Sequence, residues 1–352
     1  MQAGKVTMVR GPATVRLGGA CTLLGMDVSG MTVQVRNGRE LPFEPSPGCT
    51  LALEGGDAWD ADPLTTGTAM WAGLVERILG MSGRRLAVML VGATDTGKST
   101  LSTYIANAAI GRGLAPCVID GDIGQGDLAP PAAIGAALVR DQVVDLRDVA
   151  AGYYEFVGSV TPAGSERLVV CSMKSMLART RRISRLHIIN TDGYVADGGA
   201  AYKRMLARAL APTVIVCLGR NEGLTFALAR GRWLFLHARS SGQTAKTRSE
   251  RAGRRMDQFM RHVGGGLAAM DASKTRFVYR GRPTSLPIAA RLFARASIEG
   301  TFVGLGLRGI VTGFGVIESL DGEIQIRTGV KDFDAVYLSN IALKGGAEER
   351  RY

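Results

Sequence analysis

The sequence predicts an α/β fold in which a parallel sheet with helices on both faces is flanked by a small β domain at each end of the chain. Apolar segments typical of strands alternate with segments of helical spacing between about residues 70 and 285. Short alternating segments come before this zone, and a glycine-rich zone with short β patterns follows it. Strands that alternate with helices form parallel sheets covered on both sides. We therefore expect domains over 1–68, 69–285 and 286–352.

Turn signals divide the expected strands in the first and last zones. In "TVQVRNGRELPFE", Asn37 and Gly38 suit a type I′ turn between two strands. The segment "DAWDADPLTTGT" (57–68) is rich in turn formers and predicts a linker or surface loop. In the last zone, Asp321 and Gly322 suit a hairpin turn.

The central zone supplies the elements of the expected sheet. Buried-strand patterns occur at 85–92, 115–122, 186–193 and 213–219, and helical patterns occur at 98–113, 165–182 and 200–211. Ligands of such folds bind at the carboxyl ends of the strands. The residues that follow each strand are therefore the candidates for a functional site.

Composition and charge narrow the class of protein. The chain has no apolar run of the ~18 residues that a membrane helix needs and no secretory signal pattern at its start, so we expect it in the cytoplasm, or in the nucleus if the cell has one, with no membrane partner. The net charge of +12 favours polyanions such as nucleic acid, but is also compatible with a solvated basic surface. Five cysteines without a CxxC pair and three histidines argue against a zinc site. The thiols expected to be buried and free are Cys117, Cys171 and Cys217.

The segment after the first strand of the central zone, "GATDTGKST", carries the clearest chemistry. It fits GxxxxGK[ST] in residue type and spacing, between a strand and a helix, which is the context of a phosphate-binding loop. Its glycines let N–H groups converge on phosphate oxygens, Lys98 should reach the β- and γ-phosphates, and the Ser99 hydroxyl should ligate Mg²⁺. The alternative is a glycine-rich turn with a chance Lys-Ser pair.

This loop predicts a P-loop NTPase that binds ATP and Mg²⁺. No NKxD-type guanine reader follows it, which favours adenine over guanine. The expected nucleotide-binding residues are Gly92, Ala93, Thr94, Asp95, Thr96, Gly97, Lys98, Ser99 and Thr100.

Two acids end the second strand, in "VIDGDIGQGDLAPP". Asp120 and Asp122 are two residues apart and so share one face of the strand, at the tip that is expected beside the phosphates. One carboxylate can support Mg²⁺ or its waters, and one can accept a proton from an attacking hydroxyl. The alternative is that both are solvated turn residues.

Together, "GATDTGKST" and "DGDIGQGDLAPP" resemble the polynucleotide 5′-hydroxyl kinase family, which comprises RNA-processing cleavage-factor kinases, ribosomal-RNA-processing kinases and their archaeal relatives. The DxDxGQ segment is the specific part of this resemblance, and the flanking β domains extend it over the whole chain. The resemblance implies ATP-dependent transfer of the γ-phosphate to the 5′-hydroxyl end of RNA, with DNA as a further candidate acceptor. It also implies protein partners in RNA processing.

The resemblance implies roles for single residues. Asp122 would orient and deprotonate the attacking hydroxyl, and Asp120 would support Mg²⁺. Thr161 and Pro162 in "FVGSVTPAGSE" match the family's clasp beside the substrate. Gln125 lies in the turn over the site and is a candidate substrate contact.

Two further segments match family features. In "KTRSERAGRRMDQFMR", Arg251 and Arg255 match the RxxxR lid and lie on one helix face, while Arg254 is expected to point elsewhere. Their guanidinium groups can clamp the phosphoryl group in transfer; the alternative is a solvated basic helix. Tyr194 in "IINTDGYV" stands where relatives carry an aromatic that can stack on a base; the alternative is an ordinary core or rim tyrosine.

Other interpretations stay open at this stage. A second basic cluster can bind nucleic-acid phosphates, but is slightly better explained as a solvated helix end; it comprises Arg179, Arg181, Arg182 and Arg185. The chain as a whole can also be a non-catalytic ATP-binding scaffold of an RNA-processing complex. A third class is a partitioning-type or metallochaperone NTPase.

Overall fold

The computed structural model divides into two compact units. The first comprises Met1–Ile119, Leu138–Ala150 and Thr180–Glu250, and the second Asp120–Ala137, Ala151–Arg179 and Arg251–Tyr352. The residues described are 6–63, 66, 68–81, 83, 85–241, 247–271, 275–285, 298–319, 324–344 and 347–350. The turn expected at Asp321 and Gly322 lies outside them, and so does the stretch 286–297. The domain bounds expected from the sequence stay a prediction.

The first unit begins with two small antiparallel sheets. One has the order β4-β3-β6-β1-β8 and the other β5-β2-β7. Alternating apolar residues of both sheets, among them Val15, Leu23 and Phe43, are fully buried in one shared core. The strands are β1 (Val6–Arg10), β2 (Ala13–Gly18), β3 (Cys21–Leu23), β4 (Met26–Asp27), β5 (Thr32–Val35), β6 (Glu40–Pro45), β7 (Thr50–Glu54) and β8 (Asp57–Ala61).

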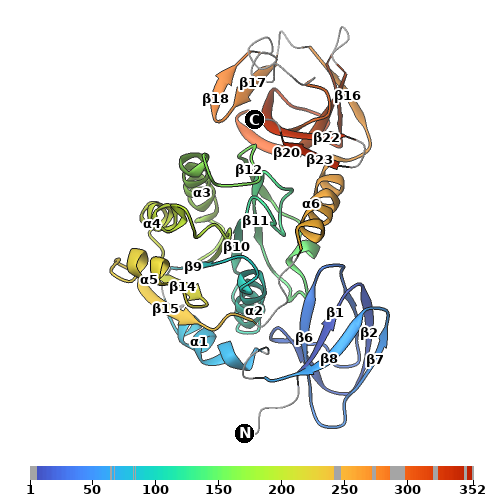
Figure 1. Cartoon of the computed structure of the whole chain (residues 1–352), viewed down its shortest axis with the longest axis vertical. Coiled ribbons are helices and arrows are strands. Elements are labelled where there is room, and N and C mark those ends of the chain that lie inside the picture. The colour runs from blue at the N-terminus through green and yellow to red at the C-terminus, as the bar shows by residue number, and fades with distance from the viewer. Residues whose placement is uncertain are drawn as a thin grey trace. The chain divides into compact units, whose positions relative to one another are not determined.

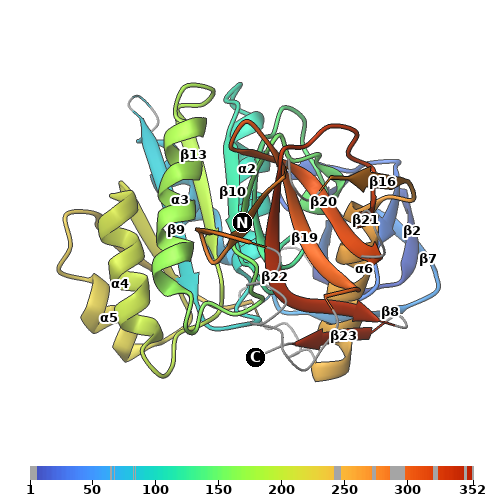
Figure 2. The same ribbon diagram turned by 90° about the horizontal axis from the view of Figure 1, so that it is seen from above.

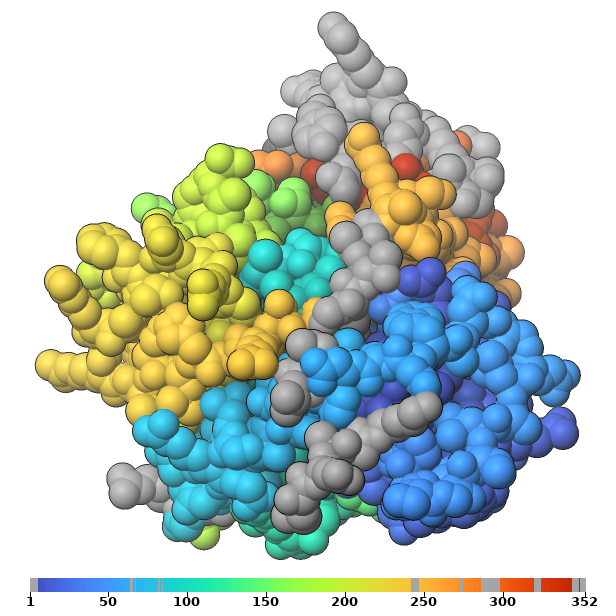
Figure 3. Space-filling model, turned by 60° about the horizontal axis from the view of Figure 1, so that its bottom comes forward, coloured from blue at the N-terminus to red at the C-terminus, as the bar shows by residue number. Residues whose placement is uncertain are grey.

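Two expectations for this region are wrong. Asp57–Ala61 is not a linker but the edge strand β8, which pairs with β1; it is exposed along most of its length, so no apolar alternation marked it as a strand (blue in Figure 3). Asn37 and Gly38 do form a turn, closed by the Arg39 N–H on the Arg36 carbonyl, but only Gly38 has positive φ. A type I′ turn needs positive φ at both positions. The turn joins two different sheets instead of closing a hairpin.

A parallel sheet forms the rest of the first unit. Its strands have the order β15-β14-β9-β13, with β10 beside β13, and every pairing recorded within the first four is parallel. Nearly every residue of β9, β10, β13 and β14 is buried, which is why they read as continuous apolar runs, whereas β15 is only partly buried. The strands are β9 (Leu86–Gly92), β10 (Cys117–Gly121), β13 (Leu186–Thr191), β14 (Val214–Leu218) and β15 (Leu234–Ala238).

Helices pack on this sheet as the alternating pattern predicts. Helix α2 contacts β9 and β13, and α1 packs on α2. Helices α4 and α5 lie side by side (Figures 1 and 2). The helices of this unit are α1 (Ala69–Leu79), α2 (Lys98–Ile110), α4 (Gly199–Leu210) and α5 (Glu222–Leu228), with a short 3-10 helix at Leu146–Asp148.

The second unit is mainly antiparallel. Its strands have the order β11-β12-β20-β19-β22-β17-β18, with β21, β16 and β23 at the sides. Aromatic rings fill one core, where Phe302 stacks on Phe314 and meets Phe259 of α6 edge to face. The helices are α3 (Glu166–Thr180) and α6 (Arg248–Val263), whose first turn belongs to the first unit. The strands are β11 (Ala133–Leu138), β12 (Tyr153–Phe156), β16 (Leu267–Met270), β17 (Arg276–Tyr279), β18 (Arg282–Thr284), β19 (Thr301–Leu307), β20 (Ile310–Ser319), β21 (Ile324–Thr328), β22 (Ala335–Lys344) and β23 (Ala347–Arg350).

The α/β class with flanking β strands is therefore confirmed, but the sheet is mixed instead of wholly parallel. The strand β11 pairs antiparallel with β12, and β12 with β20. An apolar run such as "AIGAAL" looks the same in either direction, so strand direction was not visible in the sequence. No helix in the described part of the chain is both long and apolar enough to cross a membrane.

The cysteines are free thiols, as expected, but not all are buried. Cys117 and Cys217 are fully buried, and burial raises their pKa values to about 12 and about 11. Cys171 is exposed on α3, contrary to the expectation. The apolar residues around it belong to the opposite, buried side of that helix, where Met173 and Met176 lie.

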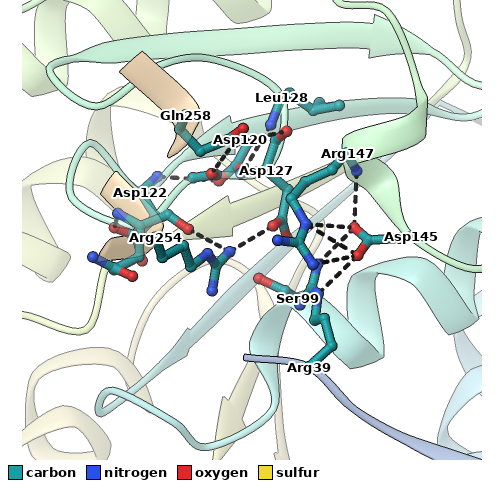
Figure 4. Close-up of polar contacts among 12 residues, drawn as sticks. Arg39, Ser99, Asp120, Asp122, Asp127, Leu128, Asp145, Arg147, Arg254 and Gln258 are labelled. Atoms are coloured by element: carbon teal, nitrogen blue, oxygen red, sulfur yellow. Dashed lines mark hydrogen bonds and ion pairs between the residues drawn. The ribbon is translucent and has the colours of Figure 1, made fainter. Parts of the chain in front are cut away.

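A buried ion-pair network ties the turn at Arg39 to the 3-10 helix of the same unit. Asp145 accepts hydrogen bonds from Arg39 Nη2 at 2.9 Å and from Arg147 Nη2 at 2.7 Å (Figure 4). Its side chain is 5% exposed. Burial alone would raise the pKa of Asp145, but the two guanidinium groups outweigh burial and hold that pKa well below its ordinary value.

Replacing Asp145 with asparagine is expected to destabilise the protein by about 3 kcal/mol at pH 7, because it leaves two buried cations without their anion. Since the folded pKa is depressed, the carboxylate stabilises the fold above its ordinary pKa of about 4, and this stabilisation is lost as the pH falls through the folded value. Urea unfolding at pH 7 and at pH values below about 4 should show the two proteins converging in acid.

The control is Asp148→Asn, because Asp148 forms an exposed ion pair with Arg36. That change should cost at most ~1 kcal/mol. A cost for Asp145→Asn that does not shrink in acid would contradict the assignment.

Candidate nucleotide and phosphoryl-transfer site

The loop after β9 has the backbone of a phosphate cradle. Gly92, Asp95 and Gly97 all have positive φ, at 154°, 59° and 92°. Helix α2 begins immediately afterwards at Lys98, so its unsatisfied N–H groups point back into the loop. A side chain at Gly92 would stand 2.7 Å from the Leu218 carbonyl oxygen. The glycine is therefore required by the neighbouring strand as well as by the turn.

Hydrogen bonds hold the side chains of Lys98 and Ser99 in the loop. Lys98 Nζ donates to the carbonyl oxygens of Gly92 at 3.0 Å and Ala93 at 2.6 Å, and the residue is only 7% exposed. Ser99 Oγ accepts a hydrogen bond from Asn190 Nδ2 at 3.3 Å. Asn190 is in β13, so the serine that is expected to meet a metal ion is oriented by the neighbouring strand.

Buried residues from other segments of the first unit contact the phosphate loop. The Ser241 N–H donates to the Thr96 carbonyl, and the indole N–H of Trp71 donates to the Arg239 carbonyl at 2.9 Å. The Trp71 side chain is almost fully buried and lies close to Gly97, where a Cβ would be 3.3 Å from its ring. The segment after β15 therefore shapes the loop, a contribution that no motif in the sequence indicated.

The end of β13 forms a second polar edge in the first unit. Asp192 Oδ2 accepts from the Tyr202 hydroxyl at 2.9 Å, and Lys203 Nζ donates to Asp192 Oδ1 and to its carbonyl at 2.8 Å. Lys203 is completely buried. The predicted stacking residue Tyr194 follows, half-buried, with its N–H on Asp192 Oδ1 and its hydroxyl on the Asp197 carbonyl. A buried cation from α4 thus fixes the turn that carries Tyr194.

Gly193 lies between these residues and touches the phosphate loop directly. A Cβ on Gly193 would stand 2.7 Å from the Thr94 nitrogen and 2.8 Å from its Cα. Backbone atoms of the loop cannot yield as a flexible side chain can. Gly193 was not predicted as a site residue; its only signal in the sequence was its position after a strand.

Replacing Gly193 with alanine is expected to weaken ATP binding about tenfold or more, because overpacking against the loop typically costs ~1–3 kcal/mol. Titration with a fluorescent ATP analogue measures the affinity. Gly73→Ala on α1 is the control, since nothing lies within 4 Å of its added Cβ. Equal affinities for both variants would show that the loop does not need this close approach.

In the second unit, the acids after β10 form a closed turn. Asp120 is 2% exposed and accepts hydrogen bonds from the N–H groups of Asp122, Asp127 and Leu128. Burial, and then the charges of Asp127 and Asp122, raise the pKa of Asp120 to about 7. Asp122 is partly exposed, and its Oδ1 accepts from the N–H groups of Gly124 at 3.0 Å and Gln125 at 2.9 Å. Asp120 is thus the buried support of the turn, and Asp122 is the acid presented at its surface.

The clasp segment packs on this turn. A Cβ on Gly124 would stand 2.8 Å from the Val160 carbonyl oxygen, so the two backbones meet there. Ser159 Oγ donates to the Thr161 carbonyl at 2.9 Å. Thr161 is partly exposed, whereas Pro162 is buried.

Helix α6 meets the same turn through Arg254, which was expected to point elsewhere than Arg251 and Arg255. Arg254 Nη2 donates to Asp127 Oδ1 at 2.6 Å and to the Gln125 carbonyl at 2.9 Å (Figure 4). The Asp127 side chain is fully buried and that of Arg254 is 11% exposed. Gln258 Nε2, one turn later, donates to the Gly126 carbonyl at 2.9 Å. The ion pair of Arg254 with Asp127 was not predicted, because helix facing alone does not reveal which acid a long side chain reaches.

The two predicted lid arginines have different surroundings. The Arg251 carbonyl accepts from Gln125 Nε2 at 3.1 Å. Arg255 Nε donates to the Glu348 carboxylate of β23, whose side chain is 6% exposed. Within the second unit, the structure thus brings together the acid turn, the clasp and α6. Four residues of this unit that support the site were not predicted from the sequence: Asp127, Arg254, Gln258 and Glu348. Only Asp127 had a signal in the sequence, because it follows the Gly-Gln pair closely in "GQGDL".

The residues present fit a nucleotide better than a metal bound by protein alone. In the described part of the chain, no three His, Cys, Asp or Glu side chains lie close enough together to hold a metal ion. The positive-φ glycines, the lysine beside them and the helix start form a cradle for phosphate oxygens. A parallel sheet with this loop at the carboxyl end of a strand defines a P-loop nucleotide-binding protein.

Comparison with known proteins shows which family the central part of the chain resembles. Residues 92–263 match the model described as mRNA cleavage and polyadenylation factor CLP1 P-loop. The chain is 33% identical over 176 residues to polyribonucleotide 5′-hydroxyl-kinase PH0197 of Pyrococcus horikoshii, covering 50% of this chain and 49% of that one. It is 36% identical over 137 residues to polyribonucleotide 5′-hydroxyl-kinase PYRAB01840 of Pyrococcus abyssi, 39% of each chain. Over these residues the chain is similar to CLP1-type and archaeal polynucleotide 5′-hydroxyl kinase proteins, the family that its motifs resemble.

The matches differ in how much they cover. The chain spans about half the length, or less, of the curated relatives it matches. The fold extends further: the solved structure of wild-type Clp1p bound to Pcf11p aligns with a TM-score of 0.74 over 96% of both chains, at 12% identity. That likeness shows the architecture, including the flanking β strands.

Proposed function

We propose that this protein transfers the γ-phosphate of ATP to the 5′-hydroxyl end of RNA. The observation that carries the proposal is the joint presence of a phosphate loop with Lys98 on its carbonyls and a presented acid, Asp122, in a chain that resembles this family. The relatives named polyribonucleotide 5′-hydroxyl-kinases support RNA as the acceptor.

ATP with Mg²⁺ would supply the phosphoryl group and the charge that polarises it. The chain's own residues then have separable tasks. The loop from Gly92 to Thr100 would bind the phosphates through backbone N–H groups, with Lys98 on the β- and γ-phosphates. Ser99 would hold the metal ion, and Asp120 would support its waters. Positioning and charge stabilisation account for such catalysis without a covalent intermediate.

Asp122 is the proposed proton acceptor for the attacking hydroxyl. Its Oδ1 is oriented by two N–H groups, while among the described residues nothing donates to its Oδ2. That oxygen can therefore accept a proton from a hydroxyl. Arg251 and Arg255 are proposed to clamp the transferring phosphoryl group, which for Arg255 requires exchange of its Glu348 contact. Gln125, Thr161, Pro162 and Tyr194 are proposed to contact the RNA.

The test is transfer of labelled γ-phosphate from ATP to a short 5′-OH RNA, with 5′-phosphorylated RNA and 5′-OH DNA as comparisons. Label on 5′-OH RNA alone, lost in Asp122→Asn, is the expected result. Label on DNA as well would widen the acceptor class. ATP binding without any label would reject the kinase and leave the ATP-binding scaffold, whose solved relative is bound to a protein partner.

A further inference from the structure

A basic pocket lies in the first unit at the amino ends of β9 and β13, whereas the phosphate loop follows the carboxyl end of β9. The cavity has a volume of about 320 Å³. Its walls come from the start of β9, from residues 113–115 between α2 and β10, and from residues 181–186 that lead into β13. Four of its lining side chains are cationic and none is acidic: Arg85, Arg181, Arg182 and Arg185.

Among the described residues, no carboxylate pairs with these arginines. Arg85 Nη1 donates to the Arg181 carbonyl, and Arg185 Nη2 donates to the Gly83 carbonyl at 3.4 Å. Throughout the described ranges, none of the four side chains forms an ion pair, and all four residues are exposed. Carbonyl oxygens orient a guanidinium group without neutralising it. The cluster therefore concentrates positive potential around a concave surface.

Hydrogen bonds hold the walls of the pocket together. Ser184 is 7% exposed; its Oγ donates to the Ala115 carbonyl at 2.7 Å and accepts from the Leu186 N–H at 3.0 Å. The Leu86 N–H donates to the Arg185 carbonyl at 2.8 Å. All three walls are thereby tied together. Burial lowers the pKa of the neighbouring His187, and the charges of Arg181 and Arg85 lower it further, so the positive potential extends into the sheet.

We propose that this pocket binds backbone phosphates of RNA, as a second contact for the substrate remote from its 5′ end. The choice of RNA rests on the proposed function. Forked guanidinium groups suit the oxygens of a phosphate, which they can engage in pairs. The seven residues of β9 separate the pocket from the phosphate loop by roughly 20 Å, at ~3.3 Å per residue. The pocket thus gives affinity for an RNA chain without taking part in phosphoryl transfer.

The experiment measures binding of single-stranded, 5′-phosphorylated RNA of about 20 nucleotides by fluorescence anisotropy, without ATP, over a range of KCl concentrations. The double variant Arg181→Ala/Arg182→Ala should bind about tenfold more weakly at low salt. Its salt slope should fall by roughly 1.4, since each lost phosphate contact on a single strand contributes ~0.7. Arg204→Ala/Arg208→Ala is the control, because it removes the same charge from exposed positions of α4 in the same unit. The affinity of this control should change less than about twofold.

Two results would overturn the inference. Equal weakening in both double variants would show that net charge alone, and not the pocket, binds RNA. Unchanged RNA affinity in Arg181→Ala/Arg182→Ala, together with weaker binding of tripolyphosphate or polyglutamate by that variant, would assign the pocket to a small phosphate ligand or an acidic protein. Because the RNA already carries a 5′-phosphate and no ATP is present, its binding does not depend on phosphoryl transfer. The binding result therefore tests the pocket independently of whether the protein is a kinase.

Discussion

Lys98→Ala is expected to reduce phosphoryl transfer to RNA by about 10³-fold or more while leaving the protein folded. The ammonium group is the only cation within the phosphate loop itself. Loss of a single neutral hydrogen-bond donor to a transition state already lowers the rate by about 10²–10³, and a cation that contacts the transferring phosphoryl group should contribute at least as much. In the structure, Nζ already lies on the Gly92 and Ala93 carbonyls at the mouth of the loop. The loss should therefore fall mainly on kcat.

The measurement is the initial rate of label transfer at saturating ATP and RNA, together with thermal unfolding. Lys174→Ala is the matched control, since Lys174 is exposed on α3. A Lys98→Ala protein that keeps more than about a tenth of the wild-type rate would contradict the assigned role. A protein that unfolds would instead show that the two hydrogen bonds are structural, and Lys98→Met then separates charge from packing.

Arg254→Met is expected to cost about 3–5 kcal/mol of stability and to lower kcat at the same time. The change leaves the fully buried Asp127 carboxylate without its cation. It also releases the Gln125 carbonyl, and with it the turn that orients Asp122. Stability and rate therefore fall together, although Arg254 itself is assigned no contact with substrate.

A double-mutant cycle tests this interpretation. Asp127→Asn combined with Arg254→Met should recover part of the lost stability, with a coupling energy of at least ~1 kcal/mol in urea unfolding. Arg261→Ala, an exposed arginine of the same helix, should be nearly neutral. Additive effects of the two changes would mean that the ion pair contributes nothing specific.

The sequence predicted the elements that have a strong local signature. The strand, glycine loop and helix around Lys98 were visible because apolar periodicity changes at GxxxxGK[ST]. The edge strand β8 was missed, since an exposed strand such as Asp57–Ala61 has no buried face to impose alternation. Strand direction in the mixed sheet depends on pairings between distant segments, such as β12 with β20, which no local pattern encodes.

The residues of the candidate site likewise fall into those with a local sequence signature and those without one. Residues within motifs, such as Asp122 and Thr161, could be named in advance. Residues that support those motifs could not, because their roles arise only when distant segments meet: Arg254 reaches Asp127 across 127 positions of sequence. Gly193 is a further example, since the need for glycine comes from the Thr94 backbone and not from its own turn.

The anchored turn around Tyr194 has a consequence for the thermodynamics of base stacking. Its hydroxyl donates to the Asp197 carbonyl at 2.6 Å, and its N–H is held by Asp192, which is itself clamped by the buried Lys203. A tyrosine held by its backbone N–H and by its ring hydroxyl has little side-chain rotational freedom left to lose. Ordering a freely rotating side chain on binding costs ~0.5–1.5 kcal/mol of free energy. If a base stacks on Tyr194, this cost is small, because the side chain is already ordered in the folded protein. Tyr194→Phe, which keeps the ring but releases it, should therefore weaken RNA binding through a less favourable entropy, detectable by calorimetry.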